Sequence, residues 1–75
     1  MFYAIAKTGF HSIRYITRMS RDGFDIDTIA IYDDVSNPGD IWKARKFKTL
    51  ASAEKALATL RATGRDDYFI RQFAS

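Results

Sequence analysis

The chain opens with stretches rich in β-branched and aromatic residues that alternate with turn-forming residues, a pattern typical of β-strands. They predict three strands in the N-terminal part, a short fourth strand before a helical segment, and a last strand after it. The five stretches are Phe2–Lys7, His11–Ser20, Asp25–Asp33, Ile41–Lys48 and Tyr68–Phe73. Residues 34–40 predict a surface loop, because Pro38 and Gly39 interrupt a strand ladder.

One amphipathic helix is predicted between the fourth and last strands. Thr49 is a suitable N-cap, because its hydroxyl can accept a hydrogen bond from the first turn, and Gly64 suits the left-handed position after the helix. Ser52, Lys55 and Thr59 are expected to point away from the sheet. The apolar residues that recur at helical spacing on one side are Leu50, Ala53, Ala56, Leu57 and Leu60.

Two predicted tight turns, Thr8-Gly9 and Asp22-Gly23, set the pairing of the first three strands. The pairs expected from them are Phe2–Tyr15, Ala4–Ile13, Arg18–Asp27, Thr17–Thr28 and Ile16–Ile29. Both reversals favour antiparallel pairing. We therefore expect an α+β fold in one domain over residues 1–75. It is an antiparallel three- to four-stranded meander with one helix packed on one face and a C-terminal strand.

The expected registers divide the side chains between two faces of the sheet. The face without charge is expected to carry the helix, and it holds Phe2, Ala4, Ile13, Tyr15, Thr17, Met19, Ile26, Ala30 and Tyr32. The other face holds Tyr3, Ile5, Arg14, Ile16, Arg18, Asp27, Ile29 and Ile31. Its isoleucines are expected to meet a partner, a second copy in a homodimer, or residues that fold back within the chain.

Charge and composition exclude several classes of protein. Twelve basic and nine acidic residues give a net charge of +3, which excludes an acidic mimic of DNA and permits nucleic-acid contact without requiring it. The absence of cysteine excludes disulfides and thiol catalysis and favours a reducing cytoplasm. No apolar run approaches the roughly 20 residues that span a bilayer, so no membrane or secretory location is expected.

Catalytic and cofactor chemistry has little support in the sequence. His11 is the sole histidine, and no third group is placed to orient it beside Ser12. The acidic pairs Asp33-Asp34 and Asp66-Asp67 lack the spacing of a calcium loop, and the four glycines are isolated. We expect a protein that is not an enzyme and that binds no metal or cofactor.

Two groups of basic residues are candidate binding surfaces. One lines the second predicted hairpin, and the other precedes the helix and alternates with aromatic residues. This mixture suits stacking and phosphate contact with nucleic acid, and it equally suits a protein interface. The ordinary alternative is that Arg18 pairs with Asp27 while Trp42 and Phe47 complete the core. The candidate partner-binding residues are Tyr3, Arg14, Ile16, Arg18, Arg21, Trp42, Lys43, Arg45, Lys46 and Lys48.

The segment Lys43–Leu57 (KARKFKTLASAEKAL), followed by Tyr68–Phe73, forms a basic strand, an alanine-rich helix and a short strand. This last third of the chain resembles a recurring element of small phage and prophage proteins, a class that includes anti-CRISPR inhibitors. The resemblance implies a non-enzymatic accessory protein in the host cytoplasm. Such a protein binds and blocks a host protein or nucleoprotein complex, a CRISPR effector being one such partner.

The run Phe47-Lys48-Thr49 is also similar to DNA-binding modules of the AP2 type and to integrase arm-binding domains. Those modules insert a three-stranded sheet into the major groove, and Arg14 and Arg18 would be the readers here. The chain departs from them in the long loop at Val35–Asp40 and in the strand after the helix. A small DNA-binding module is therefore the alternative function.

Overall fold

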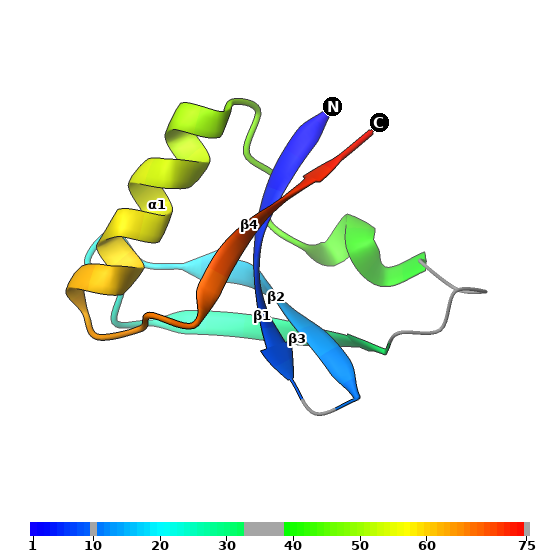
Figure 1. Cartoon of the computed structure of the whole chain (residues 1–75), viewed down its shortest axis with the longest axis horizontal. Helices are drawn as coiled ribbons and strands as arrows, with labels where there is room; N and C mark the ends of the chain where they lie inside the picture. The colour runs from blue at the N-terminus through cyan, green and yellow to red at the C-terminus, as the bar shows by residue number, and fades with distance from the viewer. Residues whose placement is uncertain (10, 33–38, 75) are drawn as a thin grey trace.

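The computed structural model describes residues 1–9, 11–32 and 39–74. Its elements are β1 (Phe2–Gly9), β2 (Ser12–Met19), β3 (Ile26–Tyr32), the 3-10 helix η1 (Gly39–Lys43), α1 (Leu50–Ala62) and β4 (Tyr68–Phe73). The strands form one antiparallel sheet in the order β3-β2-β1-β4. Figure 1 shows α1 and η1 on opposite sides of β1 and β4. The predicted α+β meander with one helix and a C-terminal strand is confirmed.

Both ends of α1 lie where local signals predict them. The N-cap Thr49 accepts a hydrogen bond through Oγ1 from the Ser52 N–H at 3.2 Å. At the other end Gly64 has φ +90° and donates to the Arg61 carbonyl, while the Arg65 N–H donates to Leu60, each at 3.0 Å. These two bonds form a Schellman motif, which terminates the helix.

The first hairpin is longer than predicted. β1 continues through Gly9, which pairs with Ser12, and Ala6 pairs with Tyr15. The predicted turn at Thr8-Gly9 and the two strand pairs built on it are therefore wrong. The observed register of β1 on β2 differs from the predicted one by an even number of residues. Side chains of β1 and of β2 before the bulge that were predicted to share a face therefore still share it.

The second hairpin contains a β-bulge that the sequence did not signal. The predicted pair Arg18–Asp27 is confirmed, but the register shifts between Ile16 and Arg18, so that Ile16 pairs with Thr28. The expected Thr17–Thr28 and Ile16–Ile29 pairs are wrong, because the bulge adds one residue to β2. It also turns Met19, beyond the bulge, to the same face as Ile16.

In β1 and in β2 before the bulge, the helix packs on the face opposite to the one predicted, whereas Met19 and Ile26 pack on the helix side as predicted. Ile5 and Ile16 are fully buried and pack with Ala53, Leu57 and Leu60 of α1. Large aliphatic side chains occur on both faces of the sheet. The apolar side of α1 packs on the face that holds Ile5 and Ile16, and this burial removes their apolar surface from water. The expectation that Ile5 and Ile16 stay uncovered by the helix is wrong.

The other face of the sheet is covered from within the chain. Ala4, Ala6, Tyr15 and Ala44 form a second buried cluster, and Ala44 comes directly after η1. The half-buried residues packed against this cluster are Ile13, Ile29, Ile31, Ile41 and Phe73. The four isoleucines expected to form one exposed patch are thus divided between two packed clusters. The aliphatic patch on which the homodimer was expected to form is absent from the described residues.

A crossing segment, residues 44–47, occupies the place of the predicted fourth strand. β1 and β2 separate beyond the Ala6–Tyr15 pair. In that gap Tyr3 and Phe47 exchange two backbone hydrogen bonds, and the Arg45 N–H donates to the Ile16 carbonyl, each at 2.8 Å. Ala44 packs in the cluster on the η1 side, and Phe47 packs in the cluster under α1. The chain therefore passes between two strands from one face of the sheet to the other.

The predicted strand over 41–48 is wrong, because residues 41–43 belong to η1 and Phe47 forms only an isolated bridge with Tyr3. The predicted loop over 34–40 lies outside the described residues as far as residue 38, and Gly39 begins η1. The last residue of the predicted third strand, Asp33, also lies outside them.

Candidate functional site: a basic pocket and a basic strip

The predicted partner-binding residues do not form one surface. Ile16 is fully buried beneath α1 and is therefore not accessible to a partner. Tyr3 is half-buried and packs against the same cluster. Arg14 and Arg18 lie on opposite faces of the sheet because the bulge falls between them. Arg14 Nε donates to Thr28 Oγ1 at 3.2 Å. Of the hairpin arginines, only Arg21 joins basic residues from elsewhere in the chain.

Arg18 is held by its cross-strand neighbour. Its Nε lies 2.7 Å from Asp27 Oδ2, and both side chains are about 61% exposed. The hydrogen bond and the charge of Asp27 raise the pKa of Arg18 above its usual value. This ion pair confirms the alternative predicted from the sequence, in which Arg18 pairs with Asp27. The guanidinium is therefore bonded within the chain.

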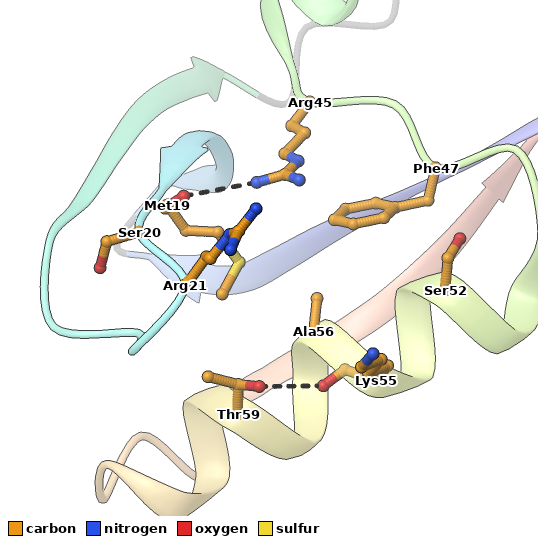
Figure 2. A pocket seen from close by; sticks show the side chains of 9 residues that line it. All are labelled: Met19, Ser20, Arg21, Arg45, Phe47, Ser52, Lys55, Ala56 and Thr59. Carbon is orange, nitrogen blue, oxygen red and sulfur yellow. Dashed lines mark hydrogen bonds between the residues drawn. The ribbon is translucent and has the colours of Figure 1, made fainter.

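Three cations converge on a pocket between the β2–β3 turn, the crossing segment and α1 (Figure 2). The turn supplies Arg21, the crossing segment supplies Arg45, and the helix supplies Lys55. The volume is about 320 Å³. The apolar lining comes from Met19, Phe47 and Ala56, and the remaining lining residues are Ser20, Ser52 and Thr59. We call this cavity the basic pocket.

The turn that carries Arg21 is fastened to the end of α1. Gly23 has φ +79° and lies so close to the helix that a Cβ there would stand 2.9 Å from Thr59 Cγ2. Arg65 Nη1 donates to the Gly23 carbonyl at 3.0 Å and to Thr63 Oγ1 at 2.8 Å. Glycine alone tolerates both this conformation and this contact, so Gly23 allows the turn to lie against α1. The position of the turn then determines where the Arg21 side chain lies.

Arg45 is positioned by its own backbone and by an aromatic ring. Its N–H is bonded into β2, its guanidinium carbon lies 5.1 Å from the centre of the Phe47 ring, and Nη1 donates to the Met19 carbonyl at 3.4 Å. In Figure 2 the guanidinium groups of Arg21 and Arg45 point into the same space beside Met19. The crossing segment therefore directs Arg45 toward the helix side of the sheet.

Among the described residues, no carboxylate lines the basic pocket. Within residues 1–9, 11–32 and 39–74, the ion pairs are Lys7–Asp67 and Arg18–Asp27, so the three pocket cations share none. The nearest acid in sequence to Arg21 is Asp22, whose carboxylate accepts from the Ser20 hydroxyl and from the Phe24 N–H. These two bonds lower the pKa of Asp22 and hold its charge within the turn.

The hydroxyl groups of the pocket are already engaged. Ser52 Oγ donates to the Thr49 carbonyl at 2.9 Å, and Thr59 Oγ1 donates to the Lys55 carbonyl at 3.2 Å. Ser20 Oγ donates to Asp22. The positive charge of the lining comes from Arg21, Arg45 and Lys55.

A second basic group lies on the η1 side of the sheet. Trp42 is 65% exposed, and Lys43 Nζ stands 5.4 Å from the centre of its indole. Lys46 Nζ donates to the Trp42 carbonyl at 2.7 Å and stands 5.5 Å from the centre of the Phe2 ring. We call Trp42, Lys43 and Lys46 the basic strip. Lys48 is exposed at the start of α1 and belongs to neither group.

Lys55 is not among the predicted binding residues. Ser52, Lys55 and Thr59, which were predicted to point away from the sheet, form the helix wall of the basic pocket. With Ala56 they make a stripe at i, i+3, i+4 and i+7, which marks a contacting helix face. That spacing was the signal that this side of α1 contacts another part of the chain. Because three of its four residues are polar, the stripe looked like a solvent-exposed side of the helix.

The described parts of the chain contain no group of three or more His, Cys, Asp or Glu residues that could hold a metal ion. None of the helices in those parts is long and apolar enough to cross a membrane. Searches of protein-family models, curated proteins and solved structures give no match for the chain.

Proposed function

We propose that this chain is a non-enzymatic accessory protein of a phage or mobile element. It binds and blocks a host protein or nucleoprotein complex in the manner of an anti-CRISPR inhibitor. The observation that carries the proposal is the basic strip, in which the exposed indole of Trp42 on η1 stands among lysines directly before the segment that is bonded into the sheet.

The exposure of Trp42 supports a protein interface. Its neighbours Ile41 and Ala44 pack against the sheet, so the burial of η1 does not depend on the indole. Tryptophan is enriched among the few residues that carry most of the binding energy of an interface. The crossing segment, which carries Lys46 of the strip, is bonded to Tyr3 and Ile16, so a partner would not have to order that segment on binding.

The lysines of the basic strip support a negatively charged partner surface. Lys43 lies over the indole and Lys46 over the Phe2 ring, so the strip places cations around an apolar centre. Such an arrangement matches the usual composition of an interface, with an apolar centre and a polar rim. The net charge of +3 adds long-range attraction to an anionic complex.

A plasmid-interference assay tests the proposal. The chain is expressed in bacteria whose CRISPR effector targets a plasmid, and the efficiency of transformation by that plasmid is measured. We expect the wild-type chain to restore transformation and to co-purify with the effector in a stoichiometric complex. Trp42→Ala should weaken that complex by about 30-fold or more, as expected for an interface anchor, and abolish the rescue.

The matched control is Arg61→Gln, which changes an exposed charge on α1 outside both basic groups. It should keep the rescue, whereas Lys43→Gln with Lys46→Gln should reduce it. Failure of the wild-type chain to rescue any effector type, with no stoichiometric host partner in a pull-down from a CRISPR-bearing lysate, would contradict the proposal.

The alternative of a sheet that reads DNA receives less support from the geometry. Arg14 and Arg18 lie on opposite faces, and each bonds to a neighbour on β3. One sheet face therefore cannot present both arginines to a groove. A mobility-shift assay at low salt checks this, and we expect no DNA complex that depends on both Arg14 and Arg18.

A further inference from the structure

We infer that the basic pocket binds the phosphate group of a nucleotide-sized organic phosphate, at a place separate from the basic strip. The inference does not rest on the proposed function, because the two basic groups lie on different sides of the sheet. Arg45 and Lys46 are consecutive in the chain, yet Arg45 contacts Phe47 beneath α1 and Lys46 contacts Phe2 and Trp42 on the η1 side.

The first argument is the convergence of like charges. Arg21, Arg45 and Lys55 come from three different parts of the chain and line one cavity, and none of its described lining residues is a carboxylate. Like charges held close together repel one another, and an anion placed among them removes that repulsion. Arginine also matches the geometry of phosphate oxygens, with which its planar group forms paired hydrogen bonds.

The second argument is the size and lining of the cavity. Its volume of about 320 Å³ falls within the range of small-molecule sites, and it exceeds what one phosphate ion needs. Met19 and Ala56 supply apolar surface beside the cations. A phosphate attached to an organic group would satisfy both parts of this lining, and inorganic phosphate would satisfy only the charged part.

The third argument is that the pocket is preorganised. The β2–β3 turn is fixed by the contact of Gly23 with Thr59 and by the bonds of Arg65, and the crossing segment is fixed by its bonds to β1 and β2. The backbones that carry Arg21 and Arg45 are therefore held in place before a ligand arrives. Side-chain ordering is then the main entropic cost of binding.

The ligand chemistry can come from two sources, a free mononucleotide or the phosphodiester of a single strand. Isothermal titration at about 20 mM salt, where screening is weak, compares AMP, adenosine, inorganic phosphate and a short oligothymidylate without terminal phosphates. We expect saturable binding of AMP, weaker binding of inorganic phosphate and none of adenosine. Tighter binding of AMP than of the oligothymidylate indicates a mononucleotide site, and the reverse order indicates a strand.

The pocket variants are Arg21→Gln and Lys55→Gln, both at exposed side chains. Each should weaken the binding of AMP about tenfold, the size of one charge-assisted hydrogen bond. Arg61→Gln and Lys46→Gln remove the same charge elsewhere and should leave the affinity unchanged. The inference is overturned if no phosphate compound binds saturably, if adenosine binds as well as AMP, or if Arg61→Gln weakens binding as much as Arg21→Gln.

Discussion

The basic pocket and the basic strip use the same residue types in different surroundings. In the strip, each lysine stands over an aromatic ring of its own side of the sheet. In the pocket, cations from three elements face one cavity, and among the described residues none is paired with a carboxylate. This difference is why we propose a large partner for the strip and a small organic phosphate for the pocket.

This difference arises from the crossing segment. Because residues 44–47 pass between β1 and β2, side chains that are neighbours in sequence are sent to opposite faces of the sheet. A run of basic residues that looks like one cluster in the sequence is thereby divided between two sites. Net charge and clustering in a sequence thus say little about which cations act together.

Phe47 and Trp42 give the largest expected difference between the basic pocket and the basic strip. Phe47 is the aromatic residue of the pocket, and Trp42 is the aromatic residue of the strip. Phe47 is 7% exposed and Trp42 is 65% exposed. Phe47→Ala should lower the free energy of unfolding by about 3–5 kcal/mol, the usual cost of removing a buried aromatic ring. Trp42→Ala should change it by no more than about 0.5 kcal/mol. Urea denaturation of both variants measures the two values.

A loss of several kcal/mol in Trp42→Ala would contradict this division, since it would make the indole part of the core. The same variant is the one that should abolish partner binding. Retained stability together with lost binding would therefore show that Trp42 serves recognition.

Gly23 and Gly64 test whether the turn positions the basic pocket. Both have positive φ, but a Cβ at Gly23 would stand 2.9 Å from Thr59 Cγ2, whereas a Cβ at Gly64 would meet nothing within 4 Å. Gly64→Ala should cost about 1–2 kcal/mol of backbone strain. Gly23→Ala should cost at least as much and should also displace the turn that carries Arg21.

Titration with AMP separates the two glycine variants. We expect weaker binding in Gly23→Ala and wild-type affinity in Gly64→Ala at temperatures where both are folded, and binding at the basic strip should be unchanged in both. Equal losses of AMP affinity in the two variants would mean that strain in general, and not the position of the turn, controls the pocket.

The smallest expected effect concerns the acid beside the pocket. The Ser20 hydroxyl and the Phe24 N–H lower the pKa of Asp22, so the charged carboxylate stabilises the folded turn. That stabilisation is present above the ordinary carboxyl range and is lost as the pH falls through the lowered pKa. Ser20→Ala should raise the pKa of Asp22 toward its usual value, so the stabilisation becomes smaller and its loss is complete at a higher pH. An NMR titration of the Asp22 carboxyl carbon measures the change.

The control for this titration is Ser52→Ala, which removes a hydroxyl from the helix wall of the same pocket. It should leave the pKa of Asp22 where it is in the wild-type chain. An unchanged pKa in Ser20→Ala would mean that the Phe24 N–H alone holds the carboxylate.

Local signals predicted the fold more fully than they predicted the site. Thr49 and Gly64 act within one helical turn, and the bounds of α1 follow from them. The bulge in β2 left no comparable signal, and it made the predicted pairing of Ile16 wrong. The prediction of the face under the helix is wrong for Ile5 and Ile16, because the absence of charge does not determine which of two apolar faces a helix covers.

The pocket depended on contacts between distant parts of the chain. Arg21 and Arg45 were both candidate residues, but their meeting requires the passage of residues 44–47 between two strands and the approach of Gly23 to α1. Neither event has a local sequence signature. Lys55 was overlooked for the same reason, since its position on the helix became meaningful only once the turn lay against it.

The claim that the cations are divided into two independent sites is tested most directly by an NMR titration with AMP at low salt, observed through backbone and side-chain N–H groups. The account predicts saturating shifts at Arg21, Gly23, Arg45 and Lys55, with the indole N–H of Trp42 unmoved. Shifts centred on Trp42 and Lys46, or spread evenly over all the basic residues, would contradict it.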